Sequence, residues 1–155
     1  MKSIVLTEPL TLEVQETERR QPGPGEALVR VHSVGICGSD MHLYRHGHIG
    51  AIVLSGPFVI GHECMGHVEE VGEGVDASLV GTRVAVDPAI PCGRCRWCLA
   101  GLYNVCPTLP FIGLPDRPGA FQEYIVHPAQ WIEPLPDDVS DDAGVVLEPL
   151  AIAMH

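Results

Sequence analysis

The run PCGRCRWCLAGLYNVC, residues 91–106, carries four of the six cysteines in the chain. Cys92, Cys95 and Cys98 are each separated by two residues, and Cys106 follows after seven more. Oxidised, these thiols would form two disulfides; reduced, they would form a closed tetrahedral site of the kind that holds structural zinc. Neighbouring Cys-x-x-Cys thiols pair poorly without strain, and the opening MKSIVLTEPLTLEV contains no apolar signal segment. We therefore predict four thiolates around a structural zinc, with no ligand position left for a substrate.

The composition is typical of one folded domain. Hydrophobic residues make up 46% of the 155 residues and charged residues 19%, and the 17 glycines and 14 prolines predict many turns. A net charge of -11 with no basic patch argues against nucleic acid as a partner. No run of about eighteen apolar residues occurs, which argues against a membrane span. We expect a cytoplasmic protein that binds neither nucleic acid nor membrane.

Short alternating runs between glycine and proline turns predict a mainly β fold, either a barrel or a sandwich, with one or two short helices. A helix is indicated only near the C-terminal end, where Ser140 could cap a run through Met154 that Pro149 interrupts. No Gly-x-Gly-x-x-Gly follows a predicted strand, so a dinucleotide fingerprint is absent. The predicted strands cover residues 10–14, 27–34, 67–71, 82–86 and 121–126.

A second set of candidate metal ligands lies outside the cysteine run. Cys37 lies between Gly35 and Gly38 at the end of a predicted strand. Gly-His-Glu occupies residues 61–63. A thiolate, an imidazole and a carboxylate around an open position are typical of catalytic zinc. A single cysteine is also often a small core residue. Spacing alone leaves both interpretations open.

Several short motifs follow one another in a characteristic order: GICGSDMH (35–42), YRHGHIG (44–50), GHECMG (61–66), VGEGV (71–75), GTRV (81–84), the four-cysteine run and LEPL (147–150). Together they resemble the zinc-dependent medium-chain alcohol dehydrogenases. The second and last motifs are most similar to the polyol branch of sorbitol, xylitol and L-idonate dehydrogenases. The resemblance implies a GroES-like β-barrel catalytic domain over residues 1–155, with a zinc lobe at about 91–107. It also implies a Rossmann cofactor domain that these 155 residues do not include.

The resemblance implies a role for each member of the second ligand set. Cys37 and His62 match two zinc ligands, and Glu63 matches the carboxylate beside them. Glu148 matches an acid that contacts zinc directly or through water in polyol enzymes. One thiolate and one carboxylate would balance the two charges of the ion, and a neutral imidazole would complete the set. The sequence does not decide whether Glu63 or Glu148 binds.

Three residues after Cys37 match the substrate and proton-transfer positions of the same family. Ser39 would hydrogen-bond the substrate hydroxyl, and His42 would pass its proton to solvent. Asp40 would hold His62 in the tautomer that leaves one ring nitrogen for the metal. Tyr44 would either line the substrate cleft or pack in the core, and Cys64 is expected to be a buried thiol rather than a ligand.

These features predict the catalytic part of a zinc-dependent, NAD- or NADP-linked alcohol or polyol dehydrogenase that forms a homo-oligomer when complete. The substrate would be a small alcohol or polyol, and the 155 residues alone would be inactive. Threonine dehydrogenase and a simple alcohol dehydrogenase are alternatives with the same chemistry. A zinc-stabilised GroES-like binding module without enzymatic activity is an alternative of another class. The set of Cys37, His62 and Glu148 discriminates between the two, because a binding module has no need of an open metal site. A zinc-free quinone-reductase-like protein is disfavoured by the intact cysteine run.

Overall fold

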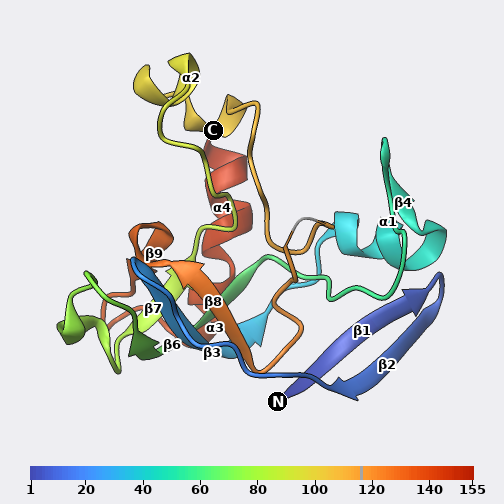
Figure 1. The fold of residues 1–155 in the computed structure, drawn as a ribbon, viewed down its shortest axis with the longest axis horizontal. Coiled ribbons are helices and arrows are strands. Elements are labelled where there is room, and N and C mark those ends of the chain that lie inside the picture. Colours follow the sequence, from blue (N-terminus) through green and yellow to red (C-terminus); the bar gives the residue numbers. More distant parts are fainter. Residues whose placement is uncertain (116) are drawn as a thin grey trace.

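The centre of the molecule is a five-stranded antiparallel sheet with the order β8-β3-β6-β7-β9 (Figure 1). The computed structural model describes residues 1–115 and 117–155. The strands of this sheet are β3 (Glu26–Val34), β6 (Cys64–Val71), β7 (Arg83–Val86), β8 (Tyr124–Pro128) and β9 (Ile132–Pro134). Two further antiparallel pairs are β1 (Lys2–Glu8) with β2 (Thr11–Glu16), and β4 (His48–Ile49) with β5 (Ile52–Val53). The prediction of a mainly β fold is confirmed, although β1, β4, β5 and β9 lie outside the predicted strands.

The strands do not close into a barrel over the described residues. β8 and β9 are the two edges of the central sheet. The β1–β2 hairpin reaches the rest of the protein through two isolated bridges, Ser3 with Gln122 and Leu6 with Phe58. Single bridges do not continue a hydrogen-bonded ladder, so the barrel expected from the sequence is an open sheet with a separate hairpin beside it.

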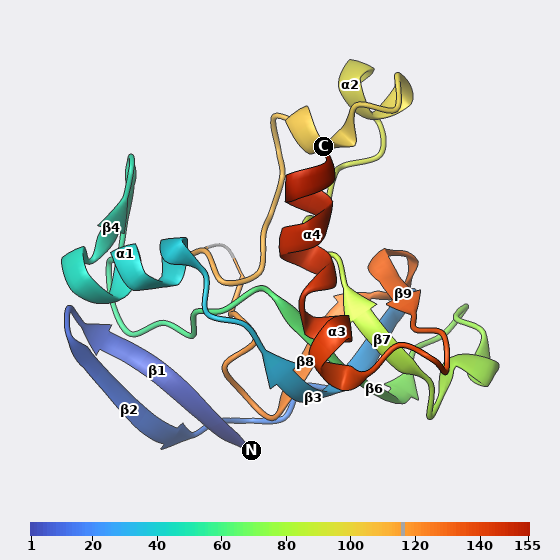
Figure 2. The same ribbon diagram turned by 180° about the vertical axis from the view of Figure 1, so that it is seen from behind.

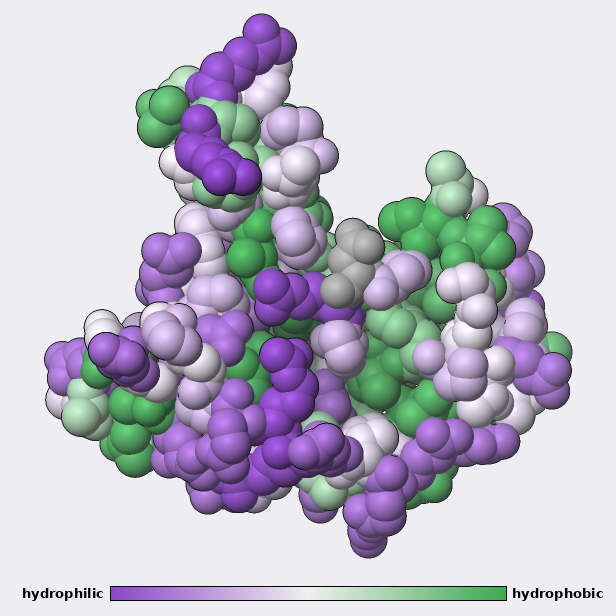
Figure 3. All heavy atoms as spheres, viewed as in Figure 1, coloured by the Kyte–Doolittle hydropathy of each residue, from purple (hydrophilic) through white to green (hydrophobic). Residues whose placement is uncertain are grey.

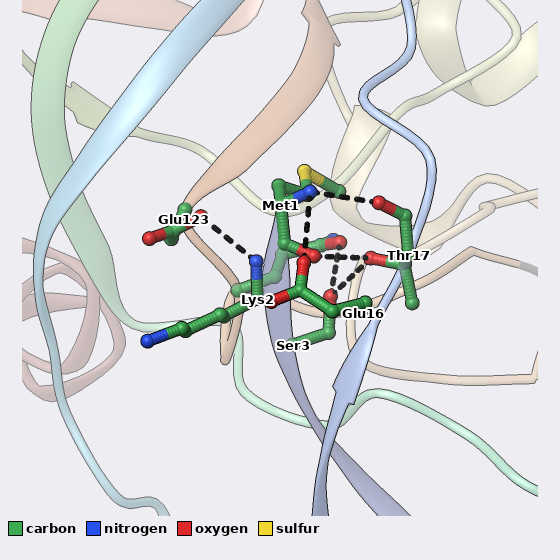
Figure 4. A network of polar contacts seen from close by, with 7 residues as sticks. Met1, Lys2, Ser3, Glu16, Thr17 and Glu123 are labelled. Carbon is green, nitrogen blue, oxygen red and sulfur yellow. Dashed lines mark hydrogen bonds and ion pairs between the residues drawn. The ribbon is translucent and has the colours of Figure 1, made fainter.

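Hydrogen bonds hold the N-terminus in place (Figure 4). The Met1 amino group donates a hydrogen bond of 2.9 Å to the Thr17 carbonyl, and the Ser3 hydroxyl lies 2.6 Å from the Thr17 hydroxyl. The Lys2 N–H donates to the Glu123 carboxylate at 2.8 Å. The contacts with Thr17 join the two ends of the hairpin to each other, and the contact with Glu123 joins β1 to the segment before β8.

The largest cluster of buried hydrophobic residues is centred on the central sheet, and a smaller one contains Met65, Ala85 and Leu135. In β3, Ala27 and Val29 are fully buried and pack against Val68 of β6 and Val84 of β7. β-Branched residues suit these positions because their side chains pack well against neighbours on a pleated surface. The other buried members of this core are Cys64, Val86, Ile112, Ala120, Ile125 and Ile132.

The described residues form four helices, of which the sequence indicated only the C-terminal run that contains the last two. They are α1 (Gly38–His46), α2 (Arg96–Leu99), α3 (Asp141–Val145) and α4 (Leu147–Met154), with short 3₁₀ turns at Ala77–Leu79, Tyr103–Val105 and Ala129–Trp131. The Ser140 hydroxyl accepts a hydrogen bond from the Ala143 N–H at 3.2 Å, as predicted. Pro149 does not interrupt the run: the break falls at Val146, and Pro149 lies in the first turn of α4, where its missing N–H is tolerated.

Helix α1 was not predicted, because its sequence shows no clear apolar periodicity. Interactions at the two ends of the helix account for its formation instead. Asp40 accepts a hydrogen bond from the Cys37 N–H at the start, and Gly47 ends the helix in the left-handed conformation with φ 69°. Leu43 is the buried anchor of the helix in a small core with Leu6 and Ile60. Tyr44 packs against this core as well.

Helix α4 runs from the sheet toward the lobe that contains α2, and the two views agree on this (Figures 1 and 2). Asn104 in the lobe lies 3.3 Å from the His155 ring, at the end of α4. In the space-filling view the lobe projects from the body with hydrophilic residues at its tip, and apolar residues gather near α1 and β4 (Figure 3). Over the described residues, the helices are all too short or too polar to cross a membrane.

Candidate metal centres

The four lobe cysteines hold their sulfur atoms within 4.8 Å of one another. The Sγ–Sγ distance is 3.5 Å for Cys95–Cys98 and 4.0 Å for both Cys92–Cys98 and Cys95–Cys106. Four sulfurs in a tetrahedron with Zn–S bonds of about 2.3 Å lie about 3.8 Å apart, whereas a disulfide needs about 2.05 Å. All four are free thiols. The arrangement fits four thiolate ligands of one zinc ion and does not fit two disulfides.

Backbone N–H groups in the lobe point at the sulfur atoms. The Cys98 N–H donates to Cys95 Sγ at the start of α2, and the Cys92 N–H donates to Cys106 Sγ, both at 3.4 Å. The N–H groups of Arg94 and Cys95 lower the pKa of Cys92 to about 6. These backbone hydrogen bonds favour the thiolate form of Cys92, which is the form that binds metal, whereas burial raises the pKa of Cys98 to about 12.

The second centre forms beside the central sheet, where the segment that follows β3 lies next to the segment that precedes β6. Strands β3 and β6 are antiparallel with Val34 opposite Cys64, so the residues after β3 run beside those before β6. The Gly35 N–H donates to the Glu63 carbonyl at 2.7 Å. This register brings the Cys37 sulfur, a His62 ring nitrogen and a Glu63 carboxylate oxygen within 4.8 Å of one another. The sequence separates these residues, and strand pairing brings them together.

Asp40 connects the two segments that carry these ligands. It is 1% exposed, and its carboxylate accepts the N–H of Cys37 and the N–H of Gly61, each at 3.0 Å. Its Oδ1 atom also lies 3.7 Å from His62 Nδ1, which is longer than a hydrogen bond but close enough for electrostatic attraction. The sequence analysis predicted that Asp40 fixes the tautomer of His62. It did not predict that Asp40 also accepts hydrogen bonds from the two backbone N–H groups.

Two glycines make this close approach possible. A Cβ atom on Gly35 would collide with the Glu63 carboxylate. Gly61 has φ 94°, a conformation that other residues rarely adopt, and from it the N–H reaches Asp40. On the other side, the Phe111 ring packs edge-on against His62 with centroids 5.2 Å apart. Phe111 was not identified from the sequence, since no local motif marks it.

Glu148 lies in the first turn of α4 and is not one of the three residues that share the 4.8 Å group. Burial raises the pKa of its carboxyl, and the charges of Glu63 and Asp87 add to this while His62 opposes it. Glu148 is thus close enough to the ligand set to feel its charges. Asp87, half-buried after β7, is a carboxylate that sequence reasoning missed; its only signal was an acidic residue at a strand end. Burial raises the pKa of Cys64 to about 12, in accordance with a buried, inert thiol.

Ser39 and His42 both lie on α1, beyond Cys37. Ser39 is half-buried and His42 is exposed. No hydrogen bond or ion pair joins either side chain to the three-ligand group within residues 1–115 and 117–155. Their predicted roles in substrate binding and proton transfer remain predictions.

Comparison with known proteins gives one family match. The model of the alcohol dehydrogenase GroES-like domain matches residues 23–137. The sorbitol dehydrogenase of Bacillus subtilis is 39% identical over 155 residues, which is 100% of this chain and 44% of that protein. The chain therefore spans less than half the length of this relative.

Solved structures give the same fold. A short chain alcohol dehydrogenase, RspB, of Escherichia coli, in complex with its cofactor NADH, superposes with a TM-score of 0.90 and 45% identity, covering 99% of this chain and 44% of that one. L-Idonate 5-dehydrogenase of Escherichia coli superposes with a TM-score of 0.91 and 32% identity, covering 99% of this chain and 45% of that one.

Proposed function

Because the chain belongs to the alcohol dehydrogenase GroES-like domain family, we propose that it is the catalytic, metal-binding part of a zinc-dependent alcohol or polyol dehydrogenase. The observation that carries this proposal is the convergence of Cys37, His62 and Glu63 within 4.8 Å. A sulfur, a nitrogen and an oxygen donor in three positions leave a fourth position for substrate, as in catalytic zinc sites. A purely structural site would use four protein ligands, as the cysteine lobe does.

Each residue of the candidate site then has a role. A zinc ion held by the three donors would polarise a substrate hydroxyl and lower its pKa. Asp40 holds Cys37 and the Gly61 turn in position through its two hydrogen bonds, and its charge orients the His62 ring. Ser39 would accept the hydroxyl proton and His42 would pass it to solvent. Burial of His62 and Glu63, at 8% and 9% exposure, keeps competing water from the ligand side of the site.

The complete protein would transfer hydride to NAD or NADP. These 155 residues carry no Gly-x-Gly-x-x-Gly, so the nucleotide would be bound by another part of the protein. We propose a neutral polyol as the substrate. Glu63 and Glu148 add negative charge near the ion and disfavour an anionic substrate, and a polyol offers adjacent hydroxyls that can meet both the metal and Ser39.

Metal analysis tests the two centres separately. Purified protein is expected to hold two zinc ions per chain, one for each ligand group. Cys37→Ser should remove the ion of the three-donor centre, and Cys95→Ser should remove that of the lobe together with much thermal stability. Cys64→Ser is the matched control, because Cys64 is a buried cysteine outside both groups. Retention of both ions by Cys37→Ser would refute the catalytic centre.

Substrate class is tested on the full-length protein, by comparing kcat/KM for sorbitol, xylitol, L-idonate, threonine and ethanol. Sorbitol or xylitol should be preferred. A clear preference for threonine or ethanol would overturn the polyol assignment and leave the metal chemistry intact. No oxidation of any alcohol, with both zinc ions present, would favour a non-enzymatic binding module instead.

A further inference from the structure

Three histidines lie together along α1 and at the start of β4, and none of them belongs to either candidate ligand group. His42 and His46 are on the helix and His48 begins β4. The ring centroids are 5.6 Å apart for His42–His46 and 6.1 Å apart for His46–His48, so His46 stands between the other two. All three residues are exposed to solvent.

The backbone places these rings side by side. Residues four apart on a helix are neighbours on its surface, which accounts for His42 and His46. Gly47, with φ 69°, then reverses the chain direction. Its N–H donates to the Leu43 carbonyl and its own carbonyl accepts the Leu54 N–H, both at 2.8 Å. The turn before His48 is thus held at both ends, and His48 is brought back toward the helix.

The three imidazoles are free to bind a ligand. None of them makes a hydrogen bond or an ion pair with any other residue that the structure describes. His46 and Glu8 both line a surface hollow of about 310 Å³. The net charge of -11 draws cations toward the protein.

We propose that His42, His46 and His48 form a third cation site, exposed and reversible, for a divalent transition metal of the kind that imidazole prefers, such as Ni²⁺, Cu²⁺ or Zn²⁺. Two imidazoles bound to one ion through metal–nitrogen bonds of about 2.1 Å have centroids about 5 Å apart. The observed separations exceed this by about 1 Å or less, and the ligand atoms of the three rings do not lie within 4.8 Å of one another, so these exposed side chains change rotamer when an ion binds. The site contains no thiolate, which distinguishes it chemically from the cysteine lobe.

The test uses protein already loaded with zinc and titrated with NiCl₂, so that Ni²⁺ reports on vacant ligands. Paramagnetic Ni²⁺ should broaden the ring resonances of His42, His46 and His48 in ¹H–¹⁵N spectra while the ring of His127 stays sharp. Calorimetry should show that His46→Gln weakens binding by roughly tenfold or more, because the shared ligand is lost. His48→Gln should weaken it less.

His155→Gln is the matched control, because His155 is also exposed but follows the end of α4, away from the cluster, and it should leave nickel affinity unchanged. A zinc-sensitive dye monitors release of bound zinc. Equal affinity in His46→Gln and the parent, broadening at other histidines, or nickel uptake matched by zinc release would each overturn the proposal. Should His46→Gln fail to fold, the proposal is still tested by the Ni²⁺ broadening of the ring resonances in the parent and by the nickel affinity of His48→Gln.

Discussion

Asp40 accepts hydrogen bonds from two backbone N–H groups on segments that carry different ligands, at 3.0 Å each. A buried carboxylate at 1% exposure is costly unless it is fully partnered, and here the partners are the N–H groups of Cys37 and Gly61. One residue thereby stabilises the start of α1, the Gly61 turn and the position of His62.

Asp40→Asn is expected to reduce both stability and metal binding. The amide has the same shape but turns an N–H₂ group toward one of the two backbone donors, which leaves buried polar groups unpaired at a cost of about 1–3 kcal/mol. Urea unfolding should show this loss, and metal analysis should show the three-donor centre depleted while the cysteine lobe stays filled. Asp137→Asn, an exposed substitution, is the control. Unchanged zinc content in Asp40→Asn would contradict the assigned role.

His127 in β8 is a buried histidine outside both metal centres. It is 0% exposed, and neither ring nitrogen has a hydrogen-bond partner among the described residues. Burial lowers the pKa of His127 from 6.5 to about 4; the nearby backbone of Asp87 opposes this shift, and the positive charge of Arg117 adds to it. The folded protein therefore keeps this ring neutral where the unfolded chain protonates it.

The sign of the resulting pH dependence follows. Above pH 6.5 both states hold a neutral ring and the group has no effect; as the pH falls toward 4, only the unfolded state gains the proton, and stability is lost. Between pH 7 and pH 5 we expect His127 to contribute a loss of about 2 kcal/mol. Urea unfolding of His127→Leu should show a correspondingly smaller fall in stability over this interval. Parallel pH profiles for variant and parent would show that His127 does not carry this loss.

At the scale of elements, a charged network fixes α3 to the central sheet. Asp141 at the start of α3 pairs with Arg83 of β7, where the Nε–Oδ1 distance is 3.0 Å, and with His32 of β3, where the Nε2–Oδ2 distance is 3.1 Å. Arg83 also donates a hydrogen bond to the Val139 carbonyl. Since α4 follows α3 after a break at Val146, this network also sets the direction from which Glu148 approaches the metal centre.

Asp141→Asn should destabilise the protein by about 1 kcal/mol, because the network is partly exposed and is screened by solvent. The loss should be smaller in 1 M salt, where the Debye length is about 3 Å. Asp142→Asn is the matched control: it is the next residue, in the same first turn, and no ion pair joins it to a described residue. Equal losses of stability in the two variants would mean that each carboxylate acts through the helix dipole and that the ion pairs of Asp141 contribute nothing.

At the scale of the whole molecule, the chain covers 44% of the length of the relative and of the NADH-bound structure described above. Its residues include two groups of side chains that could hold a metal ion but no glycine-rich dinucleotide fingerprint. Metal binding and nucleotide binding are therefore expected to be separable properties.

The 155-residue protein, loaded with zinc, should bind no NADH in titration calorimetry. The physical reason is the lack of a glycine-rich turn at a helix N-terminus, the usual support for a pyrophosphate. The full-length protein, measured in the same buffer, is the positive control. Micromolar binding by the 155 residues alone would mean that the nucleotide site lies within them.

The sequence by itself determined the mainly β fold, the family resemblance and the identity of the candidate ligands. This was achievable because Cys-x-x-Cys spacing, strand alternation and the Ser140 cap are local patterns whose chemistry does not depend on distant residues. Helix α1 escaped prediction because its stability comes from Asp40, Gly47 and the burial of Leu43, and only the first two are local. The open sheet in place of a barrel also depended on long-range pairing.

The tertiary structure alone decided which candidates meet. The register of β3 against β6 places Glu63 with Cys37 and His62, whereas Glu148 depends on the break at Val146 and on the Asp141 network, and it remains outside the group. Asp87 and Phe111 join the site from separate segments for the same reason. Pairing register and helix direction are set by contacts between residues far apart in the chain, and no local pattern encodes them.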